Sequence, residues 1–279
     1  MSTLQIDFEA EFNTHIRVPD HQAIVDRWAR EAEAYRGRAN AELDLAYGEA
    51  PRNQLDLFWP ESDRHGPIVL FIHGGYWQSF DRSWFSHFAG GPNGHGIPVA
   101  IPSTPLCPQM TLGEITEELR HCCAWLETHT GRSIVAVGHS SGAQLAAAML
   151  ASDWSLLEGR GGHRLVRAAV TISGLFDLVP LISTSINANL HLDEKQARDH
   201  SPINWPAPSG TWLSALVGWE ESPEFIRQSQ LIVDLWGEHG VHTELSVVEG
   251  ANHYAAVAGL ADAESEVSET VALLCHSLE

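Results

Sequence analysis

One serine of this 279-residue chain stands out because of the residues around it. Residues 138–142 read Gly-His-Ser-Ser-Gly; an apolar, mostly β-branched run at 134–137 precedes them, and strong helix formers occupy 143–150. This order predicts a strand, a sharp turn and a helix, with Ser140 presented at the apex as a nucleophile. Ser141 is the alternative nucleophile, but only Ser140 has a glycine two positions away on each side.

A serine hydroxyl is a weak nucleophile unless a base removes its proton and a carboxylate orients that base. In the architecture built on such a turn, the acid and then the histidine follow the serine, each after a later strand. Glu221 comes after a predicted strand at 211–217, and His253 comes after a predicted strand at 244–248. We therefore predict Ser140 as nucleophile, Glu221 as acid and His253 as base.

Other residues compete for these roles. Glu220 is adjacent to Glu221, and Asp177 lies just beyond an earlier strand end, so both are alternative acids. Asp177 is better explained as a structural carboxylate that caps or anchors the segment after it. His73 precedes two glycines at a strand end, where we expect it to hold its loop by hydrogen bonds rather than to act in catalysis.

The segment His73-Gly74-Gly75-Tyr76-Trp77 follows a predicted buried strand at 67–72. Its glycine pair allows backbone N–H groups to face a cleft, so we predict an oxyanion hole made by Gly74, Gly75 and Ser141. Four aromatic residues adjoin the predicted site residues and would form a wall for a flat substrate ring: Tyr76, Trp77, Trp219 and Tyr254.

The elements that must position these residues alternate along the chain. Strands are expected at 43–47, 55–59, 67–72, 97–101, 134–137, 166–173, 211–217 and 244–248. Helices are expected at 18–36, 111–130, 143–150, 223–236 and 264–277. The first two strands suggest an antiparallel hairpin. The whole pattern predicts a single α/β domain over 1–279, a mostly parallel sheet flanked by helices on both faces, with a small lid insertion at about 174–208.

Composition limits the partners. The formal net charge of −20 disfavours nucleic acid and anionic membrane surfaces. The four cysteines lack C-x-x-C spacing and no H-E-x-x-H is present, so we expect neither disulfides nor a metal nor another cofactor. Residues 1–13 have no basic segment typical of a secretory signal, and no apolar run is long enough to span a bilayer. We expect a soluble, cytoplasmic protein that binds a small-molecule substrate; a homodimer is compatible with the sequence.

Five segments resemble the kynurenine formamidases (arylformamidases), a family with the α/β-hydrolase fold. They are H-G-G-Y-W at 73–77, residues 138–145, S-G-L-F-D-L at 173–178 with the Pro-Leu pair at 180–181, S-P-E-F with R-Q-S at 222–229, and Asn-His at 252–253. The resemblance implies the same roles for Ser140, Glu221 and His253. The chain departs from the family in having Glu221 where Asp is more usual, and Ser-Thr-Pro at 103–105 where a Tyr is more usual.

The resemblance implies that the protein hydrolyses N-formyl-L-kynurenine to kynurenine and formate through an acyl-serine. The same residues could instead serve a carboxylesterase acting on short-chain acyl or aryl esters. A catalytically silent binding module has generally lost a triad residue, whereas all three are present here. A metal-dependent amidohydrolase would need the paired ligand spacing that this sequence lacks.

Overall fold

The predicted strands form one eight-stranded sheet in the computed structural model, which describes residues 6–156 and 164–279. The spatial order is β1-β2-β4-β3-β5-β6-β7-β8. The strands are β1 (Asn40–Ala46), β2 (Gln54–Trp59), β3 (Ile68–Ile72), β4 (Val99–Pro102), β5 (Ile134–His139), β6 (Val166–Ile172), β7 (Trp212–Gly218) and β8 (His242–Val248). β1 and β2 pair antiparallel, as do β2 and β4, and every other pair is parallel. The predicted strands and the leading hairpin are therefore confirmed.

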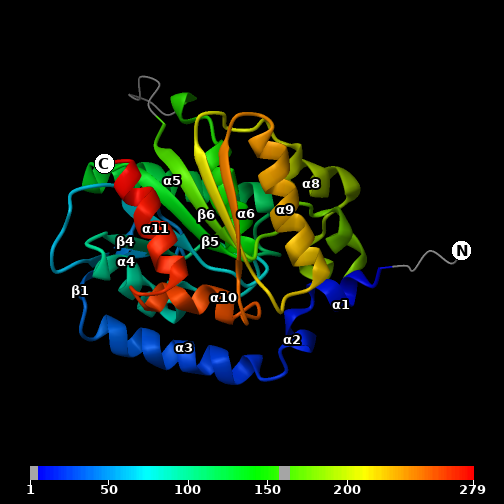
Figure 1. Cartoon of the computed structure of the whole chain (residues 1–279), viewed down its shortest axis with the longest axis horizontal. Coiled ribbons are helices and arrows are strands. Elements are labelled where there is room, and N and C mark those ends of the chain that lie inside the picture. The colour runs from blue at the N-terminus through cyan, green and yellow to red at the C-terminus, as the bar shows by residue number, and fades with distance from the viewer. Residues whose placement is uncertain (1–5, 157–163) are drawn as a thin grey trace, which may run out of the picture.

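Each face of the sheet has its own hydrophobic core. Alternate residues of β3 and β5 divide between two clusters: Leu70 and Ala136 point to one, Phe71 and Val137 to the other. This period of two explains why the central strands read as continuous apolar runs. The first cluster packs against α5 (Leu112–Thr130), α6 (Ser141–Ala151) and α9 (Pro223–Gly237), and the second against α3 (His21–Arg36) and α11 (Glu266–Ser277) (Figure 1).

The amino-terminal part of the described chain is a helical arm, residues 6–20, that leads into α3. Its helices α1 (Phe8–Phe12) and α2 (Thr14–Arg17) lie near the carboxyl ends of the central strands, at the lower right of Figure 1. Phe12 is fully buried, with its ring 5.9 Å from that of Phe225. These two helices were not predicted, because helices this short depend on tertiary packing.

The long connection between β6 and β7 contains only short elements. They are η4 (Val179–Ser183), α7 (Asn187–Leu190), α8 (Glu194–Asp199) and η5 (Pro202–Asn204). η4 packs on α1, while η5 packs on α9 and α6. Within residues 6–156 and 164–279, no helix combines the length and hydropathy needed to cross a bilayer. The absence of a secretory signal was argued from residues 1–13, of which residues 1–5 lie outside the described part of the chain.

Candidate active site

Ser140 sits between β5 and α6 in a strained conformation, with φ 57° and ψ −121°. The turn is closely packed on both sides. A Cβ atom on Gly138 would lie 2.1 Å from the carbonyl oxygen of Gly142, and one on Gly142 would lie 2.1 Å from the carbonyl oxygen of Ile72. Only glycine fits at these two positions, which is the physical reason for the G-x-S-x-G spacing. The turn places Ser140 at the start of α6, beside a cavity.

Glu221 and His253 meet at the carboxyl ends of β7 and β8. Glu221 Oε2 accepts a hydrogen bond from His253 Nδ1 at 2.7 Å. Glu221 Oε1 accepts one from the N–H of Gly218 at 2.8 Å and another from the hydroxyl of Ser173. Both side chains are buried. The carboxylate therefore fixes the proton on Nδ1 and leaves Nε2 of the neutral imidazole as the basic nitrogen.

Ser140 and His253 line the same cavity. In the described part of the chain, the Ser140 hydroxyl makes no hydrogen bond to His253. Catalytic hydrogen bonds are often long or poorly aligned in empty sites and tighten when substrate binds. The arrangement places nucleophile and base in one cavity.

His139 supports His253 from inside the elbow. Its ring centroid lies 4.7 Å from that of His253, and its Nε2 donates to the backbone oxygen of His253 at 3.0 Å. Burial, together with the nearby His253, holds the pKa of His139 well below its ordinary value, so this ring is a neutral donor. The function of His139 was not predicted, although the residue lies within the elbow motif itself.

The competing residues lie elsewhere. Glu220 is exposed, whereas Asp177 caps the N–H of Val179 at 3.2 Å and lies 3.5 Å from Arg227. The anchoring role predicted for Asp177 agrees with these contacts. His73 donates from Nδ1 to the carbonyl oxygen of Gly74 at 2.7 Å, as expected of a residue that holds its loop.

The loop after β3 brings backbone donors to Ser140. Residues 75, 76 and 77 all have positive φ angles, so the chain turns sharply here. Gly74 and Gly75 line the cavity, and a Cβ atom on Gly74 would lie only 3.0 Å from that of Ser140. Among the described residues, no acceptor takes a hydrogen bond from the N–H of Gly75, Tyr76 or Ser141. The N–H of Ser141, in the first turn of α6, has no partner within the helix. These free donors next to the nucleophile suit a developing oxyanion.

The cavity beside Ser140 has a volume of about 190 Å³. Tyr76 and Tyr254, two of the four aromatic residues expected to form a wall for the substrate, line it. The predictions for Trp77 and Trp219 were wrong. Trp77 is only 3% exposed and packs in the core, where its indole donates to Gln144 at 3.3 Å; Trp219 is 68% exposed and does not line the cavity. A position next to a site residue in sequence does not decide which way a side chain points.

The amino-terminal segment forms one wall of the cavity, a contribution that the sequence analysis did not predict. His15, His21, Gln22, Val25 and Trp28 line the cavity from α2 and α3. A helix at 18–36 was predicted, but not the surface that it would cover. No residue of the insertion at 174–208 lines the cavity, so the predicted lid is not what covers it; the arm and α3 are.

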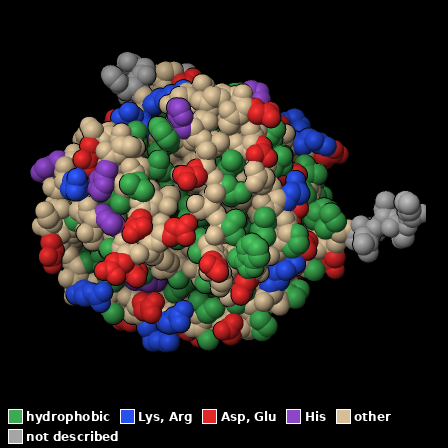
Figure 2. Space-filling view, in the orientation of Figure 1, with side chains coloured by type: hydrophobic (Ala, Val, Ile, Leu, Met, Phe, Trp, Pro, Cys, Tyr) green, Lys and Arg blue, Asp and Glu red, His purple; other side chains and the backbone are tan. Residues whose placement is uncertain are grey.

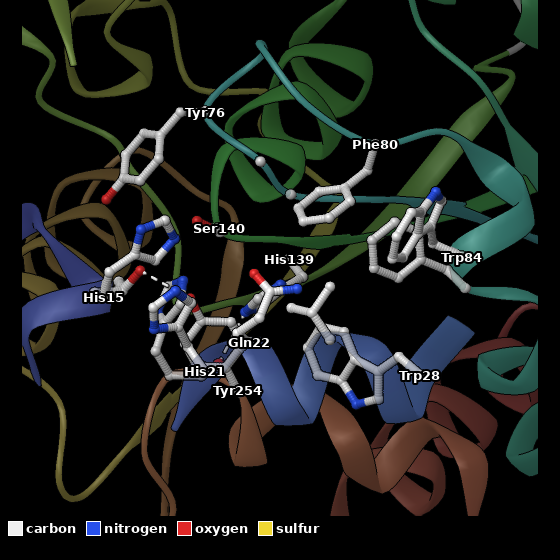
Figure 3. Close-up of a pocket in the computed structure, with 16 residues that line it drawn as sticks. His15, His21, Gln22, Trp28, Tyr76, Phe80, Trp84, His139, Ser140 and Tyr254 are labelled. Carbon is white, nitrogen blue, oxygen red and sulfur yellow. Dashed lines mark hydrogen bonds between the residues drawn. The ribbon is translucent and has the colours of Figure 1, made fainter. Parts of the chain in front are cut away.

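The labelled side chains of the cavity lie on two sides of Ser140 (Figure 3). Phe80, Trp84 and Trp28 lie on one side, whereas His15 and Tyr76 lie on the other. Among residues 6–156 and 164–279, no group of three His, Cys, Asp or Glu side chains is arranged to hold a metal ion.

Comparisons with known proteins agree with this geometry. Residues 69–248 match the alpha/beta hydrolase family. The kynurenine formamidase of Drosophila melanogaster is 30% identical over 237 residues, which cover 80% of this chain and 78% of that protein. The kynurenine formamidase of Salmo salar is 28% identical over 247 residues, covering 85% and 83%. A solved structure from Silicibacter sp. that carries a thioesterase assignment covers 98% of this chain and all of its own, with a TM-score of 0.86 and 32% identity.

Proposed function

This chain belongs to the kynurenine formamidase family of alpha/beta hydrolases, and from that premise we propose that it hydrolyses the formamide bond of N-formyl-L-kynurenine. One observation carries the proposal: His253, joined to the buried Glu221 at 2.7 Å, lines the same cavity as a serine at a strained elbow. Free backbone donors adjoin that serine. A nucleophile, an oriented base and oxyanion donors are the groups that acyl transfer through a covalent serine intermediate requires.

The first half of the proposed reaction forms the acyl-enzyme. His253 Nε2 takes the proton of Ser140 as its oxygen attacks the formyl carbon. The oxyanion that forms is held by N–H groups of Ser141 and of the loop at 74–76, where one such donor is typically worth about 3 kcal/mol of barrier. The C–N bond then breaks, and His253 gives its proton to the departing aryl nitrogen, which releases kynurenine.

The second half releases formate. Water attacks the formyl-serine ester while His253 accepts a proton from it, and the C–O bond to Ser140 breaks as that proton returns to the serine oxygen. Glu221 stays ionised and stabilises the imidazolium in both halves. These steps use no metal or organic cofactor.

The proposal extends to where the enzyme works and what it binds. We place it in the cytoplasm, which is supported by four buried cysteines that form no disulfide in the described structure. Its partner is a small-molecule substrate rather than nucleic acid or a membrane, in line with the charge of −20. We also propose that the protein forms a homodimer, and light scattering checks this by measuring its molar mass in solution.

A second candidate is a carboxylesterase for short-chain esters, favoured by the small cavity of about 190 Å³. The deciding experiment compares turnover of N-formyl-L-kynurenine with that of p-nitrophenyl acetate, for the wild type and for Ser140→Ala. We expect efficient formamide cleavage that falls at least about 10³-fold in Ser140→Ala. Good ester cleavage with negligible formamide cleavage would favour the esterase. Equal, near-zero rates for both proteins on both substrates would indicate a binding module.

A further inference from the structure

Two imidazoles of the cavity have no part in the proposed mechanism. His253 is the base and His139 holds its backbone, but His15 and His21 also line the cavity, from α2 and α3. Their rings are stacked, with centroids 4.0 Å apart and planes 4° from parallel. The ring of His21 also stacks on Tyr254 at 6.3 Å. His15 is exposed and His21 half-buried, so this histidine pair lies at the mouth of the cavity (Figure 3).

The hydrogen bonds of the pair leave nitrogen atoms free for a ligand. His21 Nδ1 donates to the carbonyl oxygen of Val18 at 3.0 Å, which leaves its Nε2 free of protein partners in the described chain. The ring of His15 makes no hydrogen bond to any described residue. The arm that carries His15 is nevertheless fixed, since the Tyr76 hydroxyl donates to the carbonyl oxygen of Phe12, and Thr14 lies 3.3 Å from the Tyr254 hydroxyl.

Charge is the second argument. The 16 residues that line the cavity include no Arg, Lys, Asp or Glu, so imidazoles are the only side chains there that can become positive. An anion that enters this cavity must therefore be neutralised or hydrogen-bonded locally. Partial burial, with His21 and His253 nearby, lowers the pKa of His15, and a carboxylate bound beside this ring would oppose that shift.

We propose that the stacked pair His15–His21 is the subsite for the carboxylate of the substrate and selects carboxylate-bearing aryl substrates over neutral ones. This inference rests on the proposed function and names the group that recognises the amino-acid end of the substrate. The layout fits, because the formamide and the amino-acid tail of N-formyl-L-kynurenine are attached to adjacent ring carbons. With the formyl carbon at Ser140, the ring lies toward Phe80 and the tail toward the histidines (Figure 3).

The binding test uses the Ser140→Ala protein, so it does not depend on turnover. L-kynurenine and 2-aminoacetophenone share the aryl ketone, but only the first carries the amino-acid group. Their dissociation constants are measured from the change in intrinsic tryptophan fluorescence, to which Trp28 and Trp84 of the cavity wall contribute. We expect His15→Gln and His21→Gln to weaken binding of L-kynurenine about tenfold relative to that of 2-aminoacetophenone, as expected for loss of a charge-assisted hydrogen bond. His15→Lys, which supplies a fixed cation, should restore most of the preference.

His242→Gln is the matched control, because His242 is also a stacked histidine, 4.3 Å from the Trp212 ring, at the opposite end of the sheet. It should leave both dissociation constants unchanged. Equal weakening of both ligands by His15→Gln and His21→Gln would overturn the proposal and give the pair a role in positioning the arm only. No change in either constant would overturn it as well.

A kinetic test separates this inference from the proposed function. The ratio of kcat/KM for N-formyl-L-kynurenine to that for 2-formamidoacetophenone should fall about tenfold in His15→Gln. If the wild type cleaves neither formamide, the proposed function fails, and the same ratio is measured with 3-acetoxybenzoate and phenyl acetate. A ratio that is unchanged in His15→Gln for the cleaved pair would count against the subsite alone.

Discussion

At the scale of single residues, burial and partners distinguish two adjacent glutamates. Glu221 accepts three hydrogen bonds, from His253, Ser173 and Gly218, whereas the side chain of Glu220 is exposed. These three hydrogen bonds direct the carboxylate at Nδ1 of the base. Glutamate is longer than the aspartate that is more usual at this position. Glu221 nevertheless makes the hydrogen bond to the imidazole of His253, at 2.7 Å.

We therefore predict different outcomes for two isosteric substitutions. Glu221→Gln should lower kcat/KM by about 10³-fold to 10⁴-fold, because the amide neither fixes the productive tautomer nor stabilises the imidazolium. Glu220→Gln should stay within about twofold of the wild type, since exposed charges interact weakly. Steady-state kinetics on the preferred substrate, beside circular dichroism to confirm folding, provide the check. A large loss in Glu220→Gln would move the acid to the neighbouring position.

At the scale of elements, the site depends on how closely α6 approaches β3 and β5. The elbow puts the first turn of α6 against the backbone of Ile72, and the loop after β3 then packs on Ser140. Nucleophile and oxyanion donors are thus held by the same contact. The arm reaches this site through the Tyr76 and Tyr254 hydroxyls, so two residues of the cavity wall also anchor the segment that covers it.

Gly142→Ala should damage the fold as well as the activity. The new Cβ would meet backbone oxygen atoms of residues 72 and 73, which cannot rotate away, so we expect the free energy of unfolding to fall by about 3 kcal/mol or more. Gly37→Ala is the control, because its Cβ would be no closer than 3.6 Å to any atom and its φ is −72°. It should change stability by less than about 1 kcal/mol. Urea denaturation measures both, and a stable Gly142→Ala protein would contradict the packing of the elbow.

At the scale of the whole molecule, acidic side chains are spread over the face in Figure 2, in keeping with the charge of −20, whereas His73, His87 and His139 are buried. Burial lowers the pKa of His73 to about 4 and that of His87 to about 4. For His87, burial is the larger cause and the nearby Arg27 lowers the pKa further, although the Glu31 carboxylate lies 3.7 Å away. Both rings are neutral in the native protein at pH 7.

Because the pKa values of these two histidines are lowered in the native state, we predict that the free energy of unfolding falls in mild acid. In the unfolded chain each takes up a proton near pH 6.5, whereas in the native state each does so only near pH 4. The unfolded state therefore binds more protons between these values, and the free energy of unfolding falls as the pH falls from about 6.5 to 4, by at most about 3 kcal/mol per histidine.

Denaturation at pH 7 and pH 5 checks this prediction. His87→Leu should lose up to about 2 kcal/mol less than the wild type over that interval, because it removes one of the two groups. The exposed His65 serves as the control, and His65→Gln should follow the wild type. Identical pH dependence in His87→Leu and the wild type would show that this ring is not held neutral.

The sequence by itself determined the strands, the long helices, the elbow and the triad candidates. These features rest on short-range rules: a period of two in strands, helix-forming runs, and glycines where a side chain would strike the backbone. Ser140, Glu221 and His253 each follow a strand of the parallel part of the sheet, so the fold class already placed them at one edge.

Only the tertiary structure decided which segment closes the site. Trp77 and Trp219 adjoin site residues in sequence yet point into the core and into solvent, because side-chain direction depends on what packs around the backbone. The arm with His15 came from more than 100 residues before Ser140, through short helices that depend on contacts such as that of Phe12 with Phe225. Such contacts join distant parts of the chain, and no local pattern of residues encodes them.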